Sequence, residues 1–298
     1  MQIVHTYQYS LSKVASHIAE VLNARVYKTS ELPPEDDTIV ISTALQPDLR
    51  SVAGHIVGAS RCVAYLVAEG VPRLDKKYVR LVNEHCHVVA PSPYVKSLLE
   101  ESGFVVSDVI PHAVRVSQAP PLGRSQVGFI GVNLFRKGID IVIKAASMLP
   151  SLSFLMATTQ HGQIPLQNIV APPNLKIITL PPGYEYSFYS SVASLFLPSR
   201  AEGFSLAPRE FVAATGRLAV VSPLPVYHDE EEGIVKCSAK DEYTVFDGHQ
   251  FVKYIEADVA DCVKKLEEAV RAPPSPSAAE EMRKRYPPEL YLKFLQFF

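Results

Sequence analysis

Short, continuous runs of apolar and β-branched residues recur through the first 110 residues of the chain. They fall at residues 2–6, 38–42, 61–67, 87–90 and 105–110. Continuous rather than alternating apolar character is typical of strands that helices cover on both faces, as in a parallel sheet. Residues 11–22 place their apolar side chains on one helical face, with Ser10 as the expected cap. Residues 93–101 form a second predicted helix, with proline in its first turn.

The same alternation restarts after a proline-rich segment, residues 117–126, which we interpret as a linker between two lobes. Strands are predicted at residues 127–132, 153–157, 175–180, 194–197 and 218–222. Helices are predicted at residues 137–149, 184–192, 205–215, 258–271 and 278–298, the last with a break at Pro287 and Pro288. Alternating strands and helices predict an α/β protein of two Rossmann-like lobes, whose parallel sheets face each other across a cleft.

The composition is that of a globular protein. The chain has 298 residues, 47% of them hydrophobic and 20% charged, and its formal net charge is −2, which gives no indication of a nucleic-acid partner. No apolar run is long enough to span a membrane, and the first residues lack the pattern of a signal peptide, so we expect a cytoplasmic protein. Arg73, Lys76, Lys77 and Arg80 have helical spacing. A solvated face is favoured for them, and peripheral contact with a membrane or an anionic acceptor is the alternative.

Neither the cysteines nor the histidines indicate a metal site. The four cysteines, none of which forms a C-x-x-C pair, are Cys62, Cys86, Cys237 and Cys262. Two or more are expected to be small buried residues, and a structural disulfide is an alternative that their spacing does not decide. His85 and His87 would share one face of a strand, but no third ligand is apparent. The sequence therefore predicts neither a metal ion nor another cofactor.

The stretch from Pro198 to Glu210, PSRAEGFSLAPRE, carries the strongest chemical signal. It follows a predicted strand, turns at Gly203 and opens a helix that Ser205 is expected to cap. A glycine loop that leads into a helix N-terminus presents free N–H groups and the positive end of the helix dipole, which suits a phosphate. Glu202 and Glu210 could accept hydrogen bonds from hydroxyls on either side of a diphosphate. The alternative is a plain turn followed by a surface glutamate.

A second stretch, residues 127–149, combines a buried strand that ends at Gly131 with a predicted helix that begins at Arg136, Lys137 and Gly138. Lys137 could meet a phosphate as a point charge, and Arg136 could bind one with two parallel hydrogen bonds. Cations at a helix start lie at the positive end of the dipole, so the pair points mildly to an anionic ligand. Two solvated basic residues are the alternative.

Together the two stretches resemble the retaining GT-B glycosyltransferases, the large family that includes glycogen and sucrose synthases and mannosyltransferases. Glu202 and Glu210 match the family's E-x(7)-E motif within a P-S-x-x-E-G-F-x-L segment, and Lys137 with Gly138 matches its K-G pair. The likeness covers roughly residues 88–230, about half of the chain. It implies an acceptor-side lobe at 1–116, the linker at 117–126, a donor lobe at 127–277, and a C-terminal helix, 278–298, that returns to the first lobe.

The resemblance also implies roles for individual residues. Glu210 would hold the ribose of a nucleoside-diphosphate sugar, and Glu202 would contact its hexose. Lys137 would stabilise the leaving diphosphate without a metal ion. The remaining donor-binding positions would be Gly203, Phe204, Ser205, Leu206, Gly131 and Arg136. The implied activity is transfer of a hexose, with retention of configuration, to a carbohydrate, lipid-linked or protein acceptor that the sequence does not identify.

The sequence departs from the family pattern in four places. Val132 stands where the family has an arginine, and the hypothesis is that Arg136 replaces it from the other side of the loop. Residues 7–12 contain no glycine, although the family has a glycine-rich loop there. Residues 64–69 contain no histidine, and Glu69 is the nearest polar candidate. His112 and Ala113 replace an Asn-Gly turn. These departures support an alternative function: a non-catalytic sugar-nucleotide-binding protein, or a partner subunit, with the same fold.

Overall fold

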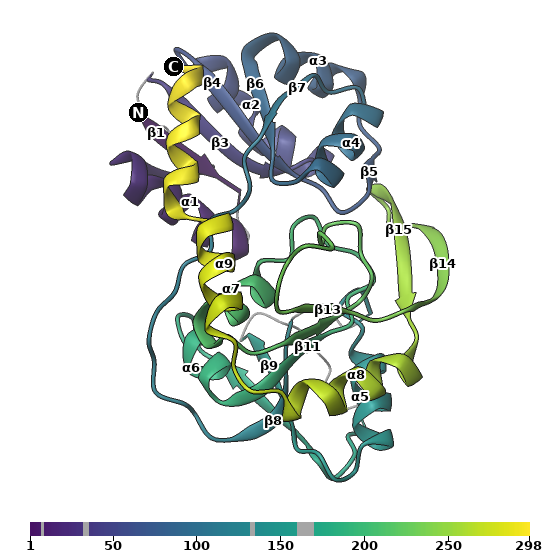
Figure 1. Cartoon of the computed structure of the whole chain (residues 1–298). Helices are drawn as coiled ribbons and strands as arrows, with labels where there is room; N and C mark the ends of the chain where they lie inside the picture. Colours follow the sequence, from purple (N-terminus) through teal and green to yellow (C-terminus); the bar gives the residue numbers. More distant parts are fainter. Residues whose placement is uncertain (7–8, 32–35, 132–134, 160–169) are drawn as a thin grey trace.

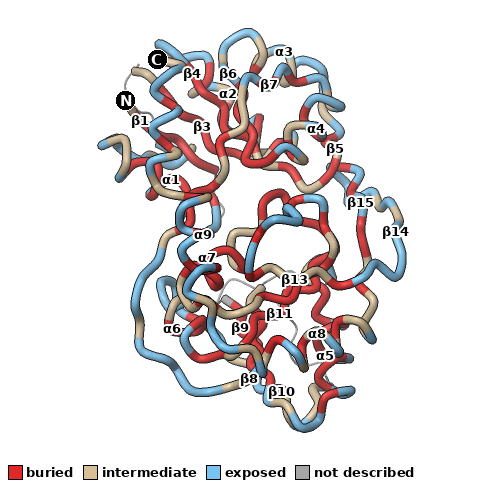
Figure 2. Tube along the Cα trace, viewed as in Figure 1, coloured by how far each residue is buried: buried red, intermediate tan, exposed pale blue. Residues whose placement is uncertain are grey.

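Two six-stranded parallel sheets, one in each lobe, organise the chain (Figure 1). The computed structural model describes residues 1–6, 9–31, 36–131, 135–159 and 170–298. Buried residues concentrate in the strands of both sheets and on the helix faces packed against them (Figure 2). The predicted α/β class, with two Rossmann-like lobes built on parallel sheets, is confirmed.

The sheet of the N-terminal lobe is covered by helices on both faces. Its strand order is β2 (Arg25–Lys28), β1 (Gln2–His5), β3 (Thr38–Thr43), β4 (Cys62–Val67), β6 (Cys86–Ala90) and β7 (Val106–Val109). All neighbours are parallel. The residues of β1, β3 and β4 are almost all buried, which explains their continuous apolar runs. The unpredicted β2 lies at the edge and is mostly exposed, so it needs no apolar run.

The helices of this lobe are α1 (Tyr9–Leu22), α2 (Gln46–Gly58), α3 (Lys76–His85) and α4 (Pro93–Glu101). α2, α3 and α4 pack on one face of the sheet and α1 on the other. α4 begins as predicted, because the Ser92 side chain accepts a hydrogen bond from the amide of Val95. The expected cap of α1 is wrong: the helix begins at Tyr9, so Ser10 lies inside it.

The C-terminal lobe carries the second sheet, in the order β10 (Leu175–Leu180), β9 (Phe154–Thr159), β8 (Ser125–Ile130), β11 (Val192–Leu197), β12 (Ala219–Val221) and β13 (Ile234–Lys236). Its helices are α5 (Ile139–Met148), α6 (Glu185–Ser190), α7 (Leu206–Thr215) and α8 (Val259–Arg271). The order reverses between β8 and β11. Ligands of such sheets bind outside the carboxyl ends of the strands at this switch point.

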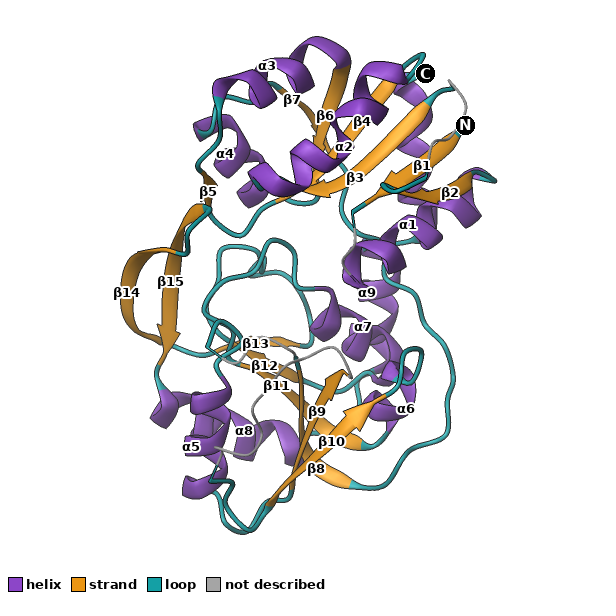
Figure 3. Ribbon diagram, turned by 180° about the vertical axis from the view of Figure 1, so that it is seen from behind, coloured by secondary structure: helices purple, strands orange, loops and turns teal. Residues whose placement is uncertain are grey.

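A β-hairpin joins the two lobes, and sequence analysis did not predict it. β14 (Ala239–Phe246) and β15 (Gln250–Ala257) are antiparallel, and β15 also pairs with β5 (Val71–Pro72) of the N-terminal lobe. A Cβ atom at Gly70 would lie 2.4 Å from the carbonyl oxygen of Phe251, so only glycine allows this approach. Figures 1 and 3 show the hairpin on the side of the molecule opposite the connection between the lobes.

The chain ends on the N-terminal lobe. α9 (Pro276–Arg285) is followed by a 3₁₀ helix, η2 (Pro288–Phe297), so the predicted break at the two prolines is present. Tyr291 and Phe294 of η2 lie in the core of the N-terminal lobe. The hydroxyl of Tyr291 accepts a hydrogen bond of 2.9 Å from the amide of Ala113. The domain boundaries given above remain predictions.

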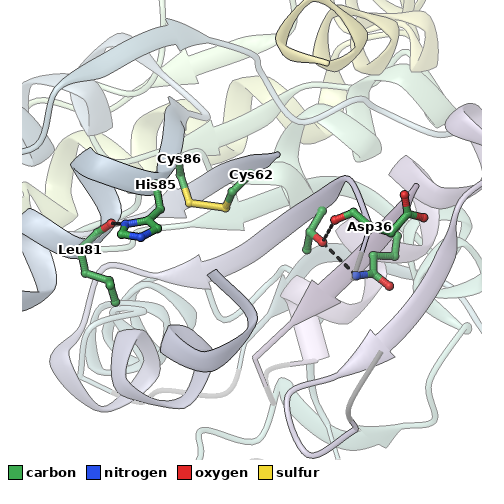
Figure 4. The surroundings of a disulfide bond; sticks show 7 residues. Asp36, Cys62, Leu81, His85 and Cys86 are labelled. Atoms are coloured by element: carbon green, nitrogen blue, oxygen red, sulfur yellow. Dashed lines mark hydrogen bonds between the residues drawn. A yellow bond between two sulfur atoms is a disulfide. The ribbon is translucent and has the colours of Figure 1, made fainter. Parts of the chain in front are cut away.

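A disulfide links the first residues of β4 and β6, Cys62 and Cys86 (Figure 4). The two residues are register partners on neighbouring parallel strands, with Cα atoms 4.5 Å apart, which is the geometry that a disulfide requires. Cys237 and Cys262 are free and buried, as expected for at least two of the four cysteines. The question that the cysteine spacing left open is therefore answered by strand register.

Candidate active site

Lys137 and Glu202 meet at the switch point of the C-terminal sheet. Lys137 follows β8, Glu202 follows β11, and the Lys137 ammonium donates a hydrogen bond to Oε1 of Glu202. The two side chains are 20% and 8% exposed, so the pair is largely shielded from water. The two residues that the resemblance implies for catalysis are thus in direct contact.

The position of Lys137 is set by a tight turn rather than by a helix. α5 begins at Ile139, after Gly138 with a φ of +69°, so the predicted helix start at Arg136 and Lys137 is wrong. A Cβ atom at Gly138 would lie 2.1 Å from the carbonyl oxygen of Pro198. Gly131 lies beneath the stem of Lys137, because a Cβ atom there would be 3.2 Å from its Cγ. Close packing of the turn against the end of β11 therefore aims Lys137 at Glu202.

Arg136 connects carboxylates of both lobes. Its guanidinium lies 2.6 Å from Oε1 of Glu69, at the end of β4, and 3.7 Å from Oε2 of Glu202. It also donates a hydrogen bond of 3.2 Å to the carbonyl oxygen of Ala201. Glu69, the nearest polar candidate in its segment, thus faces the Lys137–Glu202 pair from the N-terminal lobe.

The same environment shifts the pKa values of the two carboxyls in opposite directions. Burial raises the pKa of Glu69 more than the neighbouring Arg136 lowers it. Burial also raises the pKa of Glu202, but Lys137 and Arg136 together lower this pKa by more than burial raises it, so the net shift is downward. Opposed shifts in neighbouring carboxyls are characteristic of functional sites.

The loop from Gly203 to Leu206 packs against the N-terminal lobe. A Cβ atom at Gly203 would lie 2.6 Å from the carbonyl oxygen of Ala68, and Ser92 Oγ donates a 2.8 Å hydrogen bond to the Gly203 carbonyl. Ser205 has a φ of +61° and its side chain makes no capping bond to α7; it accepts a 2.7 Å hydrogen bond from Tyr227 instead. The expected cap is therefore wrong, because the left-handed backbone turns this side chain away from the helix.

Phe204 is buried at the junction of the lobes. Its ring meets His112 edge-on, with centroids 5.0 Å apart, and the Arg209 guanidinium lies 4.3 Å from its centroid. His112 Nδ1 is 2.9 Å from the hydroxyl of Tyr65, and burial lowers the His112 pKa to about 3. Sequence comparison treated His112 as a change in a turn, whereas the side chain supports the loop. Leu206 is the first residue of α7.

Glu210 lies on the second turn of α7, 2% exposed. Its carboxylate is 2.8 Å from the ammonium of Lys13 on α1 and accepts a 3.2 Å hydrogen bond from the hydroxyl of Tyr189. Burial raises the pKa of Glu210, and this effect is larger than the lowering that Lys13 causes. The surface alternative for Glu210 is therefore wrong. Lys13 was missed because a single lysine at the edge of an amphipathic helix gives no signal.

Val132, the position of the absent arginine, lies outside the described residues. Among the residues that the structure describes, no three His, Cys, Asp or Glu side chains are grouped so that they could hold a metal ion.

Neither a protein-family model nor a curated protein matches the chain. Solved structures do. HepE of Anabaena, crystallised with UDP and glucose, superposes with a TM-score of 0.72 at 11% identity, over 99% of this chain and 98% of that one. The α,α-trehalose 6-phosphate synthase of Burkholderia multivorans superposes with a TM-score of 0.64 at 12% sequence identity, over 97% of this chain and 77% of that one. TarM superposes with a TM-score of 0.61 at 13% sequence identity, over 95% of this chain but only 58% of the TarM chain.

These structural neighbours are GT-B glycosyltransferases, and the chain has the GT-B fold. The fold expected from the motifs is thereby confirmed. At these identities the likeness shows the fold alone, so the roles of the site residues rest on their geometry in this chain.

Proposed function

We propose that the chain transfers a hexose from a nucleoside-diphosphate sugar to an acceptor, with retention of configuration. The observation that supports this most directly is the contact between Lys137 and Glu202 at the switch point, with Glu210 buried on the helix that follows. UDP-glucose is the donor to test first, because the neighbour that superposes over nearly its whole length was crystallised with UDP and glucose.

In this proposal the donor lies outside the carboxyl ends of β8 and β11. The bond between the anomeric carbon and the diphosphate breaks, and its electron pair goes to the phosphate oxygen, where the Lys137 ammonium offsets the charge. The acceptor oxygen bonds to the anomeric carbon and its proton leaves with the diphosphate. Glu202, held near Lys137, accepts hydrogen bonds from the hexose hydroxyls, and Glu210 accepts them from the ribose.

Metal independence is part of the proposal. Lys137 and Arg136 lie within 4 Å of the same carboxylate, so two cations are already present where a diphosphate would need them. We expect excess EDTA to leave the turnover of UDP-glucose unchanged. Loss of turnover that Mg²⁺ or Mn²⁺ restores would contradict this expectation.

A second candidate function is a sugar-nucleotide-binding protein without catalysis. It is favoured by the internal ion pairs of both donor-site carboxylates, Glu202 with Lys137 and Glu210 with Lys13, which would also stabilise a protein that only binds. Incubation of the purified chain with UDP-glucose separates the two candidates. Slow release of free glucose and UDP supports the enzyme, whereas binding without release supports the second candidate.

Peripheral membrane contact is also proposed, through the hairpin and the basic residues beside it, which are Lys76, Lys77 and Arg80 of α3 and Arg73, which precedes the helix. Phe246 and Phe251 are 44% and 46% exposed, and the Arg73 guanidinium lies 5.9 Å from the Phe246 ring centroid. Exposed aromatics beside cations suit an anionic lipid surface. No described helix is long and apolar enough to cross a membrane. Co-sedimentation with vesicles that contain phosphatidylglycerol, lost when both phenylalanines are replaced by serine, tests the contact.

We propose a cytoplasmic location for the protein. The Cys62–Cys86 disulfide counts against this location, because disulfides are rare in a reducing cytosol. The thiol state of the two cysteines in intact cells therefore tests it. Fully oxidised cysteines in cells with a reducing cytosol would contradict it.

A further inference from the structure

A cavity of about 440 Å³ lies between the lobes, beside the connection that joins them. α1, α6 and α9, which contribute to its walls, lie on that side of the molecule in both Figure 1 and Figure 3. Its lining includes Lys13 and His17 of α1, Arg115 of the connection, Tyr186 of α6, and Arg283 and Pro288 near the C-terminus. The cavity is therefore built from four segments that are distant in sequence.

Basic side chains dominate the polar part of this cavity. Lys13 and Arg115 are basic side chains that are only 22% and 31% exposed. Arg283 donates to the carbonyl oxygen of Ala213, and no described carboxylate forms an ion pair with it. The anionic partners of the other two are Glu210, which is not part of the cavity lining, and Glu20, which is 64% exposed and screened by water. The walls therefore keep an excess of positive charge.

His17 lies in this positive field. It is 9% exposed, and its Nδ1 atom has no hydrogen-bond partner among the described residues. Burial first, then Arg115 and Lys13, lower the pKa of His17 to about 4. The ring is therefore neutral at pH 7, and an anion bound beside it would raise its pKa.

We propose that this cavity binds a phosphate monoester, whose phosphate group lies among Lys13, Arg115 and Arg283. Arginine matches phosphate geometry with paired hydrogen bonds, and the two arginines come from different elements. The remaining walls, Val114, Val116, Tyr186 and Pro288, offer an apolar surface to the rest of the ligand. The volume exceeds that of a phosphate group alone and lies in the range of small-molecule sites.

Lys13 couples this cavity to the donor site, and this consequence rests on the proposed function. The same ammonium is 2.8 Å from Glu210, the carboxylate proposed for the donor ribose. A phosphate in the cavity attracts Lys13 and so releases Glu210 to accept the ribose hydroxyls. Phosphate and nucleotide should therefore strengthen each other's binding, since coupling between two sites is reciprocal.

The test uses the full chain in a phosphate-free buffer and follows the ring signals of His17 by NMR during titration with inorganic phosphate and with glycerol 3-phosphate. We expect saturable shifts, a raised His17 pKa, and tighter binding of the ester than of inorganic phosphate. Arg283→Gln should weaken binding about tenfold or more, as expected when a charged hydrogen bond is lost. Lys284→Gln is the matched control, because Lys284 is on the same helix, 75% exposed and paired with Glu280; it should bind normally.

Titration with saturating UDP separates this site from the donor site. Shifts of His17 that persist or strengthen with UDP support the proposal. Displacement of phosphate by UDP would overturn it, since the cavity would then belong to the donor site. Absence of His17 shifts, or equal binding by Arg283→Gln and the parent, would also overturn it. If UDP does not bind, the phosphate titration without UDP still reports on the cavity, and Lys137→Ala should give the same His17 shifts as the parent. Failure of the proposed function is therefore distinguishable from failure of the cavity proposal.

Discussion

Replacing Lys137 by alanine removes the cation closest to the proposed leaving group. Its ammonium contacts Oε1 of Glu202, and the next cation, Arg136, is 3.7 Å from the other oxygen. A group that acts only on charge developing in the transition state lowers turnover when it is removed and spares ground-state binding. Loss of one such electrostatic contact lowers turnover by about 10²-fold or more, equivalent to roughly 3–4 kcal/mol. We therefore expect this decrease in turnover with little change in the Kd for UDP.

The same substitution also affects stability, which the design must separate from catalysis. Glu202 is only 8% exposed, and removal of one partner from a buried ion pair destabilises a fold by about 3–5 kcal/mol. The remaining Arg136 reduces this penalty. Without Lys137 the pKa of Glu202 rises, because one of the two cations that lower it is lost. In the double variant Lys137→Ala with Glu202→Gln, position 202 carries no charge that could be left buried without its partner. The double variant should therefore be more stable than Lys137→Ala alone, while its turnover stays low.

The assay is release of UDP from saturating UDP-glucose, with thermal melting of each variant as the stability control. Arg136→Ala should lower turnover less than Lys137→Ala, unless Arg136 replaces the arginine that is absent at position 132. Equal rates for Lys137→Ala and the parent would refute the reasoning. The basic pair would then only stabilise the junction of the lobes, and the protein would be a binding module.

Three further predictions concern affinity and stability. Glu210→Gln should weaken UDP binding by roughly 1.5–3 kcal/mol, since hydrogen bonds to a charged acceptor are lost; calorimetry that shows unchanged affinity would remove this residue from the donor site. Reduction of the Cys62–Cys86 disulfide, which closes a sequence separation of 24, should lower the free energy of unfolding by about 3.5 kcal/mol on the chain-entropy model; an unchanged denaturation midpoint under reductant would argue against it. Because burial lowers the folded-state pKa of His112 to about 3, the unfolded chain binds more protons below pH 6.5, so stability should fall as the pH falls from 6.5 towards 3. His112→Gln should flatten that dependence in urea titrations, and an unaltered slope would contradict the assignment.

Sequence pattern predicted the two sheets well, for a physical reason. Strands covered on both faces need continuous apolar runs, and β1, β3 and β4 have them. The elements that were missed obey other rules. β2 is an exposed edge, and β14 is exposed except at the half-buried Tyr243 and Val245. The other strand of the hairpin, β15, pairs with β5, which is two residues long and distant in sequence.

For the site, local motifs identified Lys137, Glu202 and Glu210, and the structure brings the first two into contact. Of their partners from the other lobe, Glu69 was named only as the nearest polar candidate of its segment, and Lys13 was not predicted. Glu69 and Lys13 belong to a strand end and a helix whose sequences carry no motif, and only the packing of the lobes brings them to Arg136 and Glu210. The side chain of Ser205 was assigned a capping role from its residue type, and the left-handed backbone at that position prevents it.

We propose that the C-terminal lobe holds a nucleoside-diphosphate sugar and cleaves its glycosidic bond. The most direct measurement is chromatography of the products after the purified chain is incubated, in excess EDTA, with UDP-glucose and with GDP- and ADP-hexoses in parallel. We expect slow release of hexose and nucleoside diphosphate in equal amounts from one donor class, with UDP-glucose tested first. For Lys137→Ala we expect that release to decrease by about 10²-fold or more. No release from any of the donors, or release that Lys137→Ala leaves unchanged, would contradict it.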